Sequence, residues 1–236
     1  DYNVHVQISH LASQSMWYTK ACIETIEEAI AEGIDVGFDC YPYDAFCTYA
    51  GSTVFDDGFV ERWRGKGPEY LEAVSGKFTG QRLTWETLKI MREEEPMALI
   101  AGYVLNPDEV EMCLTHPKCI VVSDGLYTGG GAHPRIAGTF PRVLNILIEK
   151  GFTWTDALKK ITTMPADLFS LNAGRLRVGG AADISVFHPE ELRDEATFYE
   201  PFKPASGIKL IVVNGKVALE DGALNREKQG RFFFSA

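Results

Sequence analysis

Two short apolar segments of the sequence end in side chains that can bind a metal ion. His10 ends the segment VHVQISH, and Asp124 ends the segment CIVVSD. A neutral imidazole and a carboxylate are suitable ligands for a catalytic zinc ion. A carboxylate beside the metal can also take a proton from a bound water molecule, whose pKa the cation lowers to about 7. Taken alone, each residue has a simpler interpretation, because a strand-end histidine is more often structural and an SDG aspartate often caps a turn.

A strand–helix–strand pattern surrounds His10. Residues 4–10 alternate in character like a strand, isoleucines then recur at helical spacing, and residues 34–43 (IDVGFDCYPY) form a second strand-like segment. Such units build parallel sheets. In a (β/α)8 barrel the reactive groups lie where the strands end. We therefore expect an α/β fold in which His10, Tyr43 and Asp124 lie at one edge of a parallel sheet.

Capping residues predict several of the helices that follow. Thr84 precedes one helix, Asn106-Pro107 starts another, and Thr153 with Asp156 caps a third. Between the first two, MALIAGYV (97–104) is expected to be a short buried strand. The apolar positions expected on the helix stripes are Trp85, Leu88 and Met91, then Val110, Cys113 and Leu114, and then Val143, Leu144, Leu147 and Ile148 after a glycine-rich loop.

Residues 44–82 are rich in glycine and aromatic residues and have no long regular period. A connection of this length is usually functional, for example an active-site lid, or carries short helices of its own. From Gly174 the pattern changes to short strands and turns that end in RFFFSA, and Asn214-Gly215 predicts a hairpin because both residues tolerate positive φ. We therefore predict two domains, residues 1–173 and residues 174–236.

The composition excludes several kinds of partner. A net charge of −10 and a pI near 5.0 weigh against nucleic acid, because phosphate binding needs a basic surface. No apolar run approaches the roughly 20 residues needed to cross a bilayer, so no membrane partner is expected. The first residues show no signal peptide, and the five cysteines show no CxxC spacing. Reduced thiols in the cytoplasm are therefore expected.

Several motifs follow one another in a distinctive order. ISH is followed by a helix, DCYPY, a long insertion, VVSDG and then HPRIAGTFPRVL. This order resembles the second half of the N-acyl-D-amino-acid deacylases, a family of the metal-dependent amidohydrolase superfamily. The stretch from TWTDALKK to AADISVF resembles the amidohydrolase transition from the last barrel helix to the β-sandwich, and GIKLIVVNGKVALEDG is similar to the deacylase tail. The resemblance covers essentially all 236 residues.

The resemblance implies strands six to eight of a (β/α)8 TIM-like barrel, followed by part of a small β-sandwich, with zinc as cofactor. It implies that His10 is a zinc ligand and that Asp124 lies beside the metal, as general base toward water and then general acid toward the departing amine. Tyr43 and Arg135 would hold the α-carboxylate of the substrate, for which an arginine fork is well suited. Ser52 would line the same pocket, and the insertion would cover the substrate.

The function implied by the resemblance is hydrolysis of small N-acyl-D-amino acids to a carboxylate and a free D-amino acid. Members of the family carry an HxH pair and further ligands in a first half that these residues do not include. They also commonly carry a lysine shortly after the first histidine, where this sequence has Ala12 and Ser13. Three strands cannot close a barrel. We therefore expect a fragment that alone binds zinc weakly and is inactive, and that needs the N-terminal half or a second copy as partner.

Two other functions fit parts of the pattern. One is hydrolysis of a cyclic amide, as in dihydroorotases and hydantoinases, although the HPR motif and the long insertion argue against it. The other is a non-catalytic scaffold or oligomerisation module. Among the remaining histidines, His133 is expected to form hydrogen bonds rather than bind metal, and His5, His116 and His188 are expected to be structural or exposed.

Overall fold

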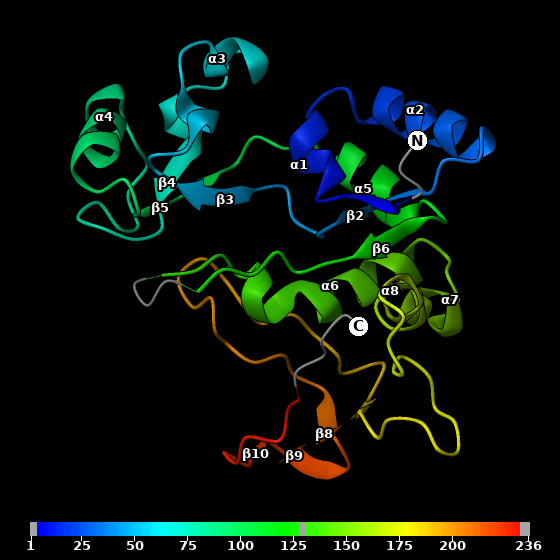
Figure 1. Cartoon of the computed structure of the whole chain (residues 1–236). Helices are drawn as coiled ribbons and strands as arrows, with labels where there is room; N and C mark the ends of the chain where they lie inside the picture. The colour runs from blue at the N-terminus through cyan, green and yellow to red at the C-terminus, as the bar shows by residue number, and fades with distance from the viewer. Residues whose placement is uncertain (1–3, 128–130, 232–236) are drawn as a thin grey trace. The chain divides into compact units, whose positions relative to one another are not determined.

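The computed structural model describes residues 4–127 and 131–231 (Figure 1). The chain forms two compact units. The first comprises Asp1–Thr139 and Ala196–Lys203, and the second comprises Phe140–Glu195 and Pro204–Ala236. The predicted RFFFSA segment lies outside the described residues from position 232 onward. The first unit thus contains every residue for which the sequence predicts chemistry.

A parallel sheet of three strands, in the order β1-β2-β6, organises the first unit. The strands are β1 (Val6–Ile8), β2 (Val36–Cys40) and β6 (Cys119–Val121). Ile8 lies opposite Phe38, and Phe38 lies opposite Cys119. Helix α2 (Thr19–Ala31) links β1 to β2, so the predicted strand–helix–strand unit is confirmed. All three strands point the same way, and we call the end at which they finish the carboxyl edge.

Three helices pack together against β2: α1 (Leu11–Ser15), α2 and α5 (Pro107–Thr115). Asn106 caps α5 by accepting a hydrogen bond from the backbone N–H of Asp108. The predicted apolar stripe of α5 is buried: Val110, Cys113 and Leu114. Because α2 and α5 each end shortly before a strand begins, both helices start toward the carboxyl edge.

The segment 44–82 and the strand predicted at 97–104 form a separate antiparallel sheet in the order β3-β5-β4 (Figure 1). Its strands are β3 (Phe46–Tyr49), β5 (Leu99–Gly102) and β4 (Leu71–Ala73). The helical turns between β3 and β4 are η1 (Thr53–Phe55), α3 (Phe59–Arg62) and η2 (Pro68–Tyr70). The short helices are predicted from the sequence, whereas the pairing of β5 with the insertion is not.

Aromatic packing explains why the glycine-rich insertion is ordered. Phe59 and Trp63 have ring centroids 4.7 Å apart, and Phe46 of β3 packs on Trp63 at 5.5 Å. Phe55 joins the same cluster through Phe59 and Trp63. Such rings remove large apolar areas from water without needing a regular sequence period.

Helix α4 (Trp85–Glu94) begins with a capping box in which Thr84 and Thr87 exchange side chain–backbone hydrogen bonds. Leu88 and Met91 are buried as predicted. Trp85, which stands on the same predicted stripe, is 63% exposed and packs on Phe59 of the aromatic cluster with ring centroids 5.5 Å apart. The first turn of α4 therefore lies outside the core.

The second unit combines helices with a four-stranded antiparallel sheet in the order β10-β9-β8-β7. Its elements are α7 (Trp154–Lys159), α8 (Thr163–Leu168), β7 (Ile184–Phe187), β8 (Ile208–Val213), β9 (Lys216–Glu220) and β10 (Ala223–Leu224). Asn214 and Gly215 have φ values of 52° and 79° and join β8 to β9, which confirms the predicted hairpin. The Thr153 hydroxyl accepts a hydrogen bond from Asp156 N–H at 3.1 Å, which confirms the predicted cap.

Two segments connect the units along the chain. Helix α6 (Arg135–Glu149) starts in the first unit and continues into the second, and its buried positions include Val143, Leu144 and Leu147. The segment Ala196–Lys203 belongs to the first unit, where Phe198 packs on Tyr103 with ring centroids 4.9 Å apart. None of the described helices is both long and apolar enough to cross a membrane.

The Thr84 cap gives a first testable prediction. Replacing Thr84 by Ala removes the acceptor for the Thr87 N–H, so the free energy of unfolding should fall by about 1 kcal/mol. Urea unfolding followed by circular dichroism measures the change. Thr25→Ala, which removes a hydroxyl from an exposed position inside α2, is the matched control and should leave stability nearly unchanged. An equal loss in both variants would contradict the assignment of the cap.

Candidate active site

The carboxyl edge of the parallel sheet gathers residues that can do chemistry. His10, Tyr41 and Asp124 come shortly after the ends of β1, β2 and β6. The rings of His10 and Tyr41 have centroids 6.2 Å apart, and Arg135 Cζ lies 4.7 Å from the centroid of the Tyr41 ring. Nη2 of Arg135 lies 2.8 Å from Oδ2 of Asp124. The structure thus brings His10, Arg135 and Asp124 together around the buried Tyr41.

A buried carboxylate fixes His10 at the end of its strand. His10 has a φ of 39°, which non-glycine residues seldom adopt. Its backbone N–H donates to Oδ1 of Asp39 at 2.6 Å, and Oδ2 of Asp39 accepts from Gln7 Nε2 at 3.1 Å. Asp39 is only 3% exposed, so these hydrogen bonds satisfy a carboxylate that water barely reaches. Asp39 therefore ties the end of β1 to β2 and sets the direction of His10.

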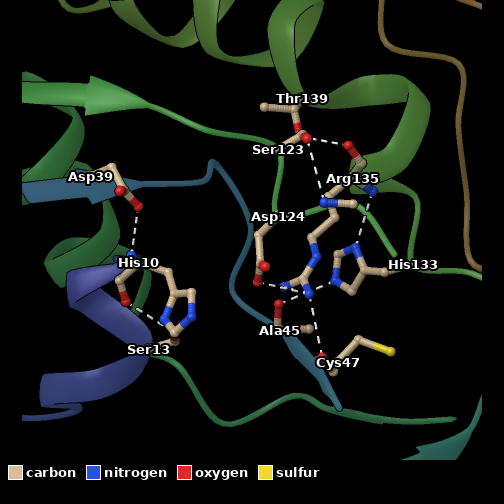
Figure 2. Close-up of polar contacts among 11 residues, drawn as sticks. His10, Ser13, Asp39, Ala45, Cys47, Ser123, Asp124, His133, Arg135 and Thr139 are labelled. Carbon is tan, nitrogen blue, oxygen red and sulfur yellow. Dashed lines mark hydrogen bonds and ion pairs between the residues drawn. The ribbon is translucent and has the colours of Figure 1, made fainter. Parts of the chain in front are cut away.

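Ser13 sets the tautomer of the His10 ring (Figure 2). Its Oγ lies 2.9 Å from the His10 carbonyl oxygen and 2.9 Å from His10 Nδ1. The carbonyl oxygen can only accept, and the hydroxyl has one proton, so the hydroxyl donates to the carbonyl and accepts from a protonated Nδ1. Nε2 then carries the lone pair, and no hydrogen bond of the described residues uses it. This is the form in which an imidazole binds a metal ion.

Arg135 is a buried cation, and its Nε–H group has no hydrogen-bond acceptor among the described residues. The residue is 3% exposed, and its Nη2 donates to the Cys47 carbonyl at 3.3 Å in addition to its ion pair with Asp124. Figure 2 shows the guanidinium and the carboxylate facing each other. The Nε–H is shielded from solvent and has no acceptor among the described residues. An unpaired buried polar group costs about 1–3 kcal/mol, so this N–H is a hydrogen-bonding position that an anionic group can fill.

His133 supports the start of α6. Its Nδ1 accepts a hydrogen bond from the Arg135 backbone N–H at 3.0 Å, and its Nε2 donates to the Ala45 carbonyl at 3.1 Å. Both nitrogens are thus engaged, in line with the hydrogen-bonding role that the sequence predicts. Phe198 packs on the His133 ring at 4.7 Å. The buried Tyr43 packs edge-on against the same ring, with centroids 4.9 Å apart, so it lies beside the residue that holds Arg135.

The hydrogen bond of the Ser52 side chain is local and does not involve the residues described above. It is the N-cap of η1, where its Oγ accepts a hydrogen bond from Val54 N–H at 3.3 Å. No hydrogen bond or ion pair within the described ranges joins Ser52 to Arg135 or Asp124. Its side chain therefore has a local structural partner in the insertion.

Burial controls the protonation of two other groups at the site. It raises the pKa of the Cys47 thiol to about 12, although the Arg135 cation acts in the opposite direction. It also raises the pKa of the Tyr41 phenol, against the lowering effects of Arg135 and the Ser13 hydroxyl. Both groups are therefore neutral near pH 7. The side chain of Asp124, in contrast, is 38% exposed.

The donor set fits part of a metal site. His10 Nε2 and the Asp124 carboxylate are suitable zinc ligands by type. Within residues 4–127 and 131–231, no group of three His, Cys, Asp or Glu side chains converges on one point. A catalytic zinc usually takes three protein ligands. A complete zinc site therefore requires further ligands from elsewhere.

Several known proteins resemble the chain in sequence and in fold. The sequence profile of the amidohydrolase family matches residues 109–218. The chain is 32% identical to an N-acyl-D-glutamate deacylase of Alcaligenes xylosoxydans xylosoxydans over 83% of the chain, and 31% identical to a D-aminoacylase of that organism over 98% of the chain. Residues 109–218 belong to the amidohydrolase family. The predicted resemblance is confirmed, and the chain spans about half the length of the curated relatives it matches, 41% and 49% respectively.

Solved structures support the same assignment. The chain matches a crystal structure of a D-aminoacylase with a TM-score of 0.82 and 30% identity, over 97% of the chain and 49% of that protein. It also matches an N-acyl-D-glutamate deacylase from Bordetella bronchiseptica, solved with zinc and a phosphonate inhibitor, with a TM-score of 0.78 and 27% identity over 93% and 48% of the two chains. An L-hydantoinase from Arthrobacter aurescens, at 20% identity and a TM-score of 0.52, shares the fold.

Two residues that position the site were missed by sequence reasoning. Asp39 stands inside the quoted DCYPY motif, and Ser13 was noted only as a departure from the family pattern. A signal for Asp39 was available, because a carboxylate inside an otherwise apolar strand needs a buried partner. Ser13 stands three residues after His10, where the unusual φ of His10 brings its hydroxyl to the ring, and no sequence signal gives that φ.

Cys47 yields a prediction for the pH dependence of stability. In the unfolded chain the thiol ionises near its ordinary pKa of 9.0, whereas in the fold its pKa is about 12. As the pH rises, the unfolded chain therefore loses the thiol proton before the folded chain does. The contribution of the Cys47 thiol to the free energy of unfolding is complete below about pH 9 and is lost as the pH rises toward about 12.

Urea unfolding at several pH values above 9 measures this effect. Between the two pKa values, the free energy of unfolding should fall more steeply for the wild type than for Cys47→Ser, by up to about 1.4 kcal/mol per pH unit. Ionisation of Tyr41 contributes equally to the slopes of both proteins, so the difference between the two slopes reports on Cys47 alone. Equal slopes would show that the Cys47 thiol ionises alike in the folded and unfolded chains.

Proposed function

We propose that the natural protein containing these residues is a zinc-dependent hydrolase that cleaves N-acyl-D-amino acids to a carboxylate and a free D-amino acid. The observation that carries this proposal is the buried Arg135, which faces Asp124 at the carboxyl edge and has an unfilled Nε–H. The family membership and the deacylase names of the relatives at 32% and 31% identity support the same reaction.

The finer architecture is part of the proposal. We assign β1, β2 and β6 to strands six, seven and eight of a (β/α)8 barrel, since their order and parallel pairing fit consecutive barrel strands. We place the start of the small β-sandwich domain near residue 174 and interpret the segment 44–82 as the part that covers the substrate. The remaining barrel strands and metal ligands would come from the other half of the protein.

His10 and Asp124 are proposed to hold the zinc ion together with ligands from that other half. The Nε2 lone pair of His10 is available for this purpose because Ser13 occupies Nδ1. When bound, zinc supplies Lewis acidity, which polarises the acyl carbonyl and makes water a stronger nucleophile at neutral pH. Asp39 holds the His10 backbone and so limits the movement of the ring.

Asp124 transfers the protons in the proposed reaction, and Arg135 binds the substrate. Asp124 accepts a proton from water as it attacks the acyl carbonyl, and passes this proton to the amine nitrogen as the C–N bond breaks. Arg135, with Tyr43 beside it, holds the α-carboxylate. A substrate carboxylate competes with Asp124 for the guanidinium. Substrate binding therefore loosens the ion pair and frees the Asp124 carboxylate to act as a base.

Hydrolysis of a cyclic amide is the second candidate. A dihydroorotase of Bacillus cereus (strain B4264) is 38% identical, but the match covers only 34% of the chain. The deacylase matches extend over 83% and 98% of the chain. The deacylase function is therefore favoured, and a non-catalytic role has no observation of its own in its favour.

The proposed role of Asp124 can be tested in the natural protein with N-acyl-D-amino acids. Asp124→Asn should lower kcat by about 10²–10⁴-fold, because proton transfer is lost. Asp44→Asn, which changes an exposed carboxylate beside Tyr43, is the matched control and should keep full activity. Thermal unfolding shows whether each variant is folded. A folded Asp124→Asn protein with wild-type kcat would exclude Asp124 as the proton-transfer group.

The role of Ser13 in holding His10 leads to a prediction about metal affinity. Ser13→Ala removes the group that fixes the imidazole tautomer, so the zinc dissociation constant should rise about 10–100-fold. Competition with a chromophoric chelator measures it without an activity assay. Ser15→Ala removes a hydroxyl from the same helix and should leave the affinity unchanged. Identical zinc affinity in wild type and Ser13→Ala would rule out this positioning.

A further inference from the structure

A chain of hydrogen bonds leads from an exposed carboxylate of the first unit to His10. It begins at Asp35, whose Oδ1 lies 2.8 Å from Nδ1 of His5, and it continues from Nε2 of His5 to Oε1 of Gln7 at 3.3 Å. Gln7 Nε2 donates to Asp39 Oδ2 at 3.1 Å, and Asp39 Oδ1 accepts from the backbone N–H of His10 at 2.6 Å (Figure 2). We call His5, Gln7 and Asp39 the His5 relay.

The His5 relay lies on one face of the parallel sheet. His5 and Gln7 are two residues apart, and the contact between their side chains places both on the same face. Gln7 lies opposite Gly37 of β2, and Asp39 stands two residues further along β2. A Cβ atom at Gly37 would lie 2.7 Å from Gln7 Oε1. The φ of Gly37 is not positive, so the glycine is needed here for the space that it leaves to Gln7.

The two carboxylates that flank His5 and Gln7 determine where the protons of the relay lie. An ionised Asp35 can only accept, so Nδ1 of His5 carries a proton. An ionised Asp39 can also only accept, so the Gln7 amide turns its NH2 group toward Asp39 and its oxygen toward His5. That oxygen accepts a hydrogen bond from the ring only if Nε2 is protonated as well. All the bonds of the relay therefore form together only when the His5 ring is an imidazolium.

Loss of the second ring proton breaks the relay at one of two bonds. With the amide in its present orientation, the lone pair of His5 Nε2 faces the Gln7 oxygen, and no hydrogen bond forms between them. If the amide turns over, Gln7 donates to His5 instead, and its oxygen then faces Oδ2 of Asp39. Asp39 is only 3% exposed and forms no ion pair among the described residues, so each of its hydrogen bonds matters. In both cases Asp39 is held less firmly than before.

Asp35 favours the imidazolium form of His5. Its hydrogen bond raises the pKa of His5 above the ordinary value of 6.5, and burial of the ring acts in the opposite direction. The hydrogen bond to Gln7 and the negative charge of Asp35 raise the pKa further. Among the described residues, Asp35 is the one charged group that acts on the ring, because the neighbouring strand presents the uncharged Gly37. The relay is therefore complete at low pH and loses a bond as the pH rises past the pKa of His5.

We propose that His5 and Gln7 are positioning residues that act on His10 through Asp39, so that protonation of His5 strengthens zinc binding by the natural protein. Asp39 holds the His10 backbone at its unusual φ of 39°, so a loosened Asp39 lets the imidazole move away from the metal. This inference rests on the proposed function, since it takes His10 as a zinc ligand. Zinc binding usually weakens as the pH falls, because protons compete for the ligands. The relay opposes that trend.

The test measures the zinc dissociation constant of the natural protein by chelator competition at about pH 6 and about pH 9. His5→Phe should raise the constant about 10-fold at the lower pH, where the wild-type relay is complete, and less than about 2-fold at the higher pH. Comparing the two proteins at one pH cancels the proton competition at His10 itself. His188→Phe replaces an exposed histidine of the second unit and should change neither value. An equal effect of His5→Phe at both pH values would overturn the inference.

A double-variant cycle shows whether His5 acts through Gln7. In Gln7→Leu protein the relay is already broken, so adding His5→Phe should change the zinc dissociation constant less than about 2-fold at about pH 6. Gly37→Ala displaces the end of the Gln7 side chain and should make zinc binding equally insensitive to His5→Phe. Thermal unfolding shows that each variant is folded. If the effect of His5→Phe persists at full size in both backgrounds, the relay is wrong.

Metal-free protein keeps this inference separate from the proposed function. The raised pKa of His5 means that its contribution to stability is present below pH 6.5 and is lost as the pH rises through the folded-state pKa. His5→Phe should therefore lower the urea midpoint of unfolding more at about pH 6 than at about pH 9, and Gln7→Leu should reduce that difference. If this holds while His10→Ala leaves zinc affinity unchanged, the proposed role of His10 fails and the relay stands. If Gln7→Leu leaves the difference intact, the relay fails whatever the metal does.

Discussion

The parallel alignment of β1, β2 and β6 is the constraint on which the candidate site depends. Because the three strands finish at one edge, His10 lies beside Tyr41, and Asp124 pairs with the Arg135 that stacks on the same Tyr41 ring. Reversal of any one strand would send its terminal residue to the opposite edge. The bonds of Asp39 to His10 N–H and to Gln7 reinforce this alignment, since they join the end of β1 to β2.

The sequence predicts those parts of the fold that depend on local chemistry. Caps, helix stripes and the Asn214-Gly215 turn are confirmed because each depends on neighbouring residues. The contacts of Arg135 could not be predicted, because its bond to the Cys47 carbonyl joins residues 88 positions apart. Strands β3 and β4 were also missed, since segments of four and three residues are too short to show a period. The roles of His10, Tyr43, Ser52, Asp124 and Arg135 came from the family resemblance and stay proposals.

The cations of the first unit differ in whether a carboxylate balances their charge. Arg135 is buried, stacked on Tyr41 and paired with Asp124, so its charge is balanced in the absence of any ligand. Arg64 and Lys66 share the Trp17 indole ring and have no such balance among the described residues. A buried charge without a counter-charge is costly, whereas an exposed one is tolerated in water. The arrangement around Arg135 therefore favours a fixed site.

The return of residues Ala196–Lys203 to the first unit has a consequence for biosynthesis. His133 holds the start of α6, and Phe198 packs against its ring at 4.7 Å. As the nascent chain leaves the ribosome, Tyr43, Asp124 and Arg135 emerge well before Phe198 does. The surroundings of His133 are therefore completed only after α7 and α8 of the second unit have been synthesised. Until then, a translating ribosome carries Tyr43, Asp124 and Arg135 without the packing of Phe198 on the His133 ring.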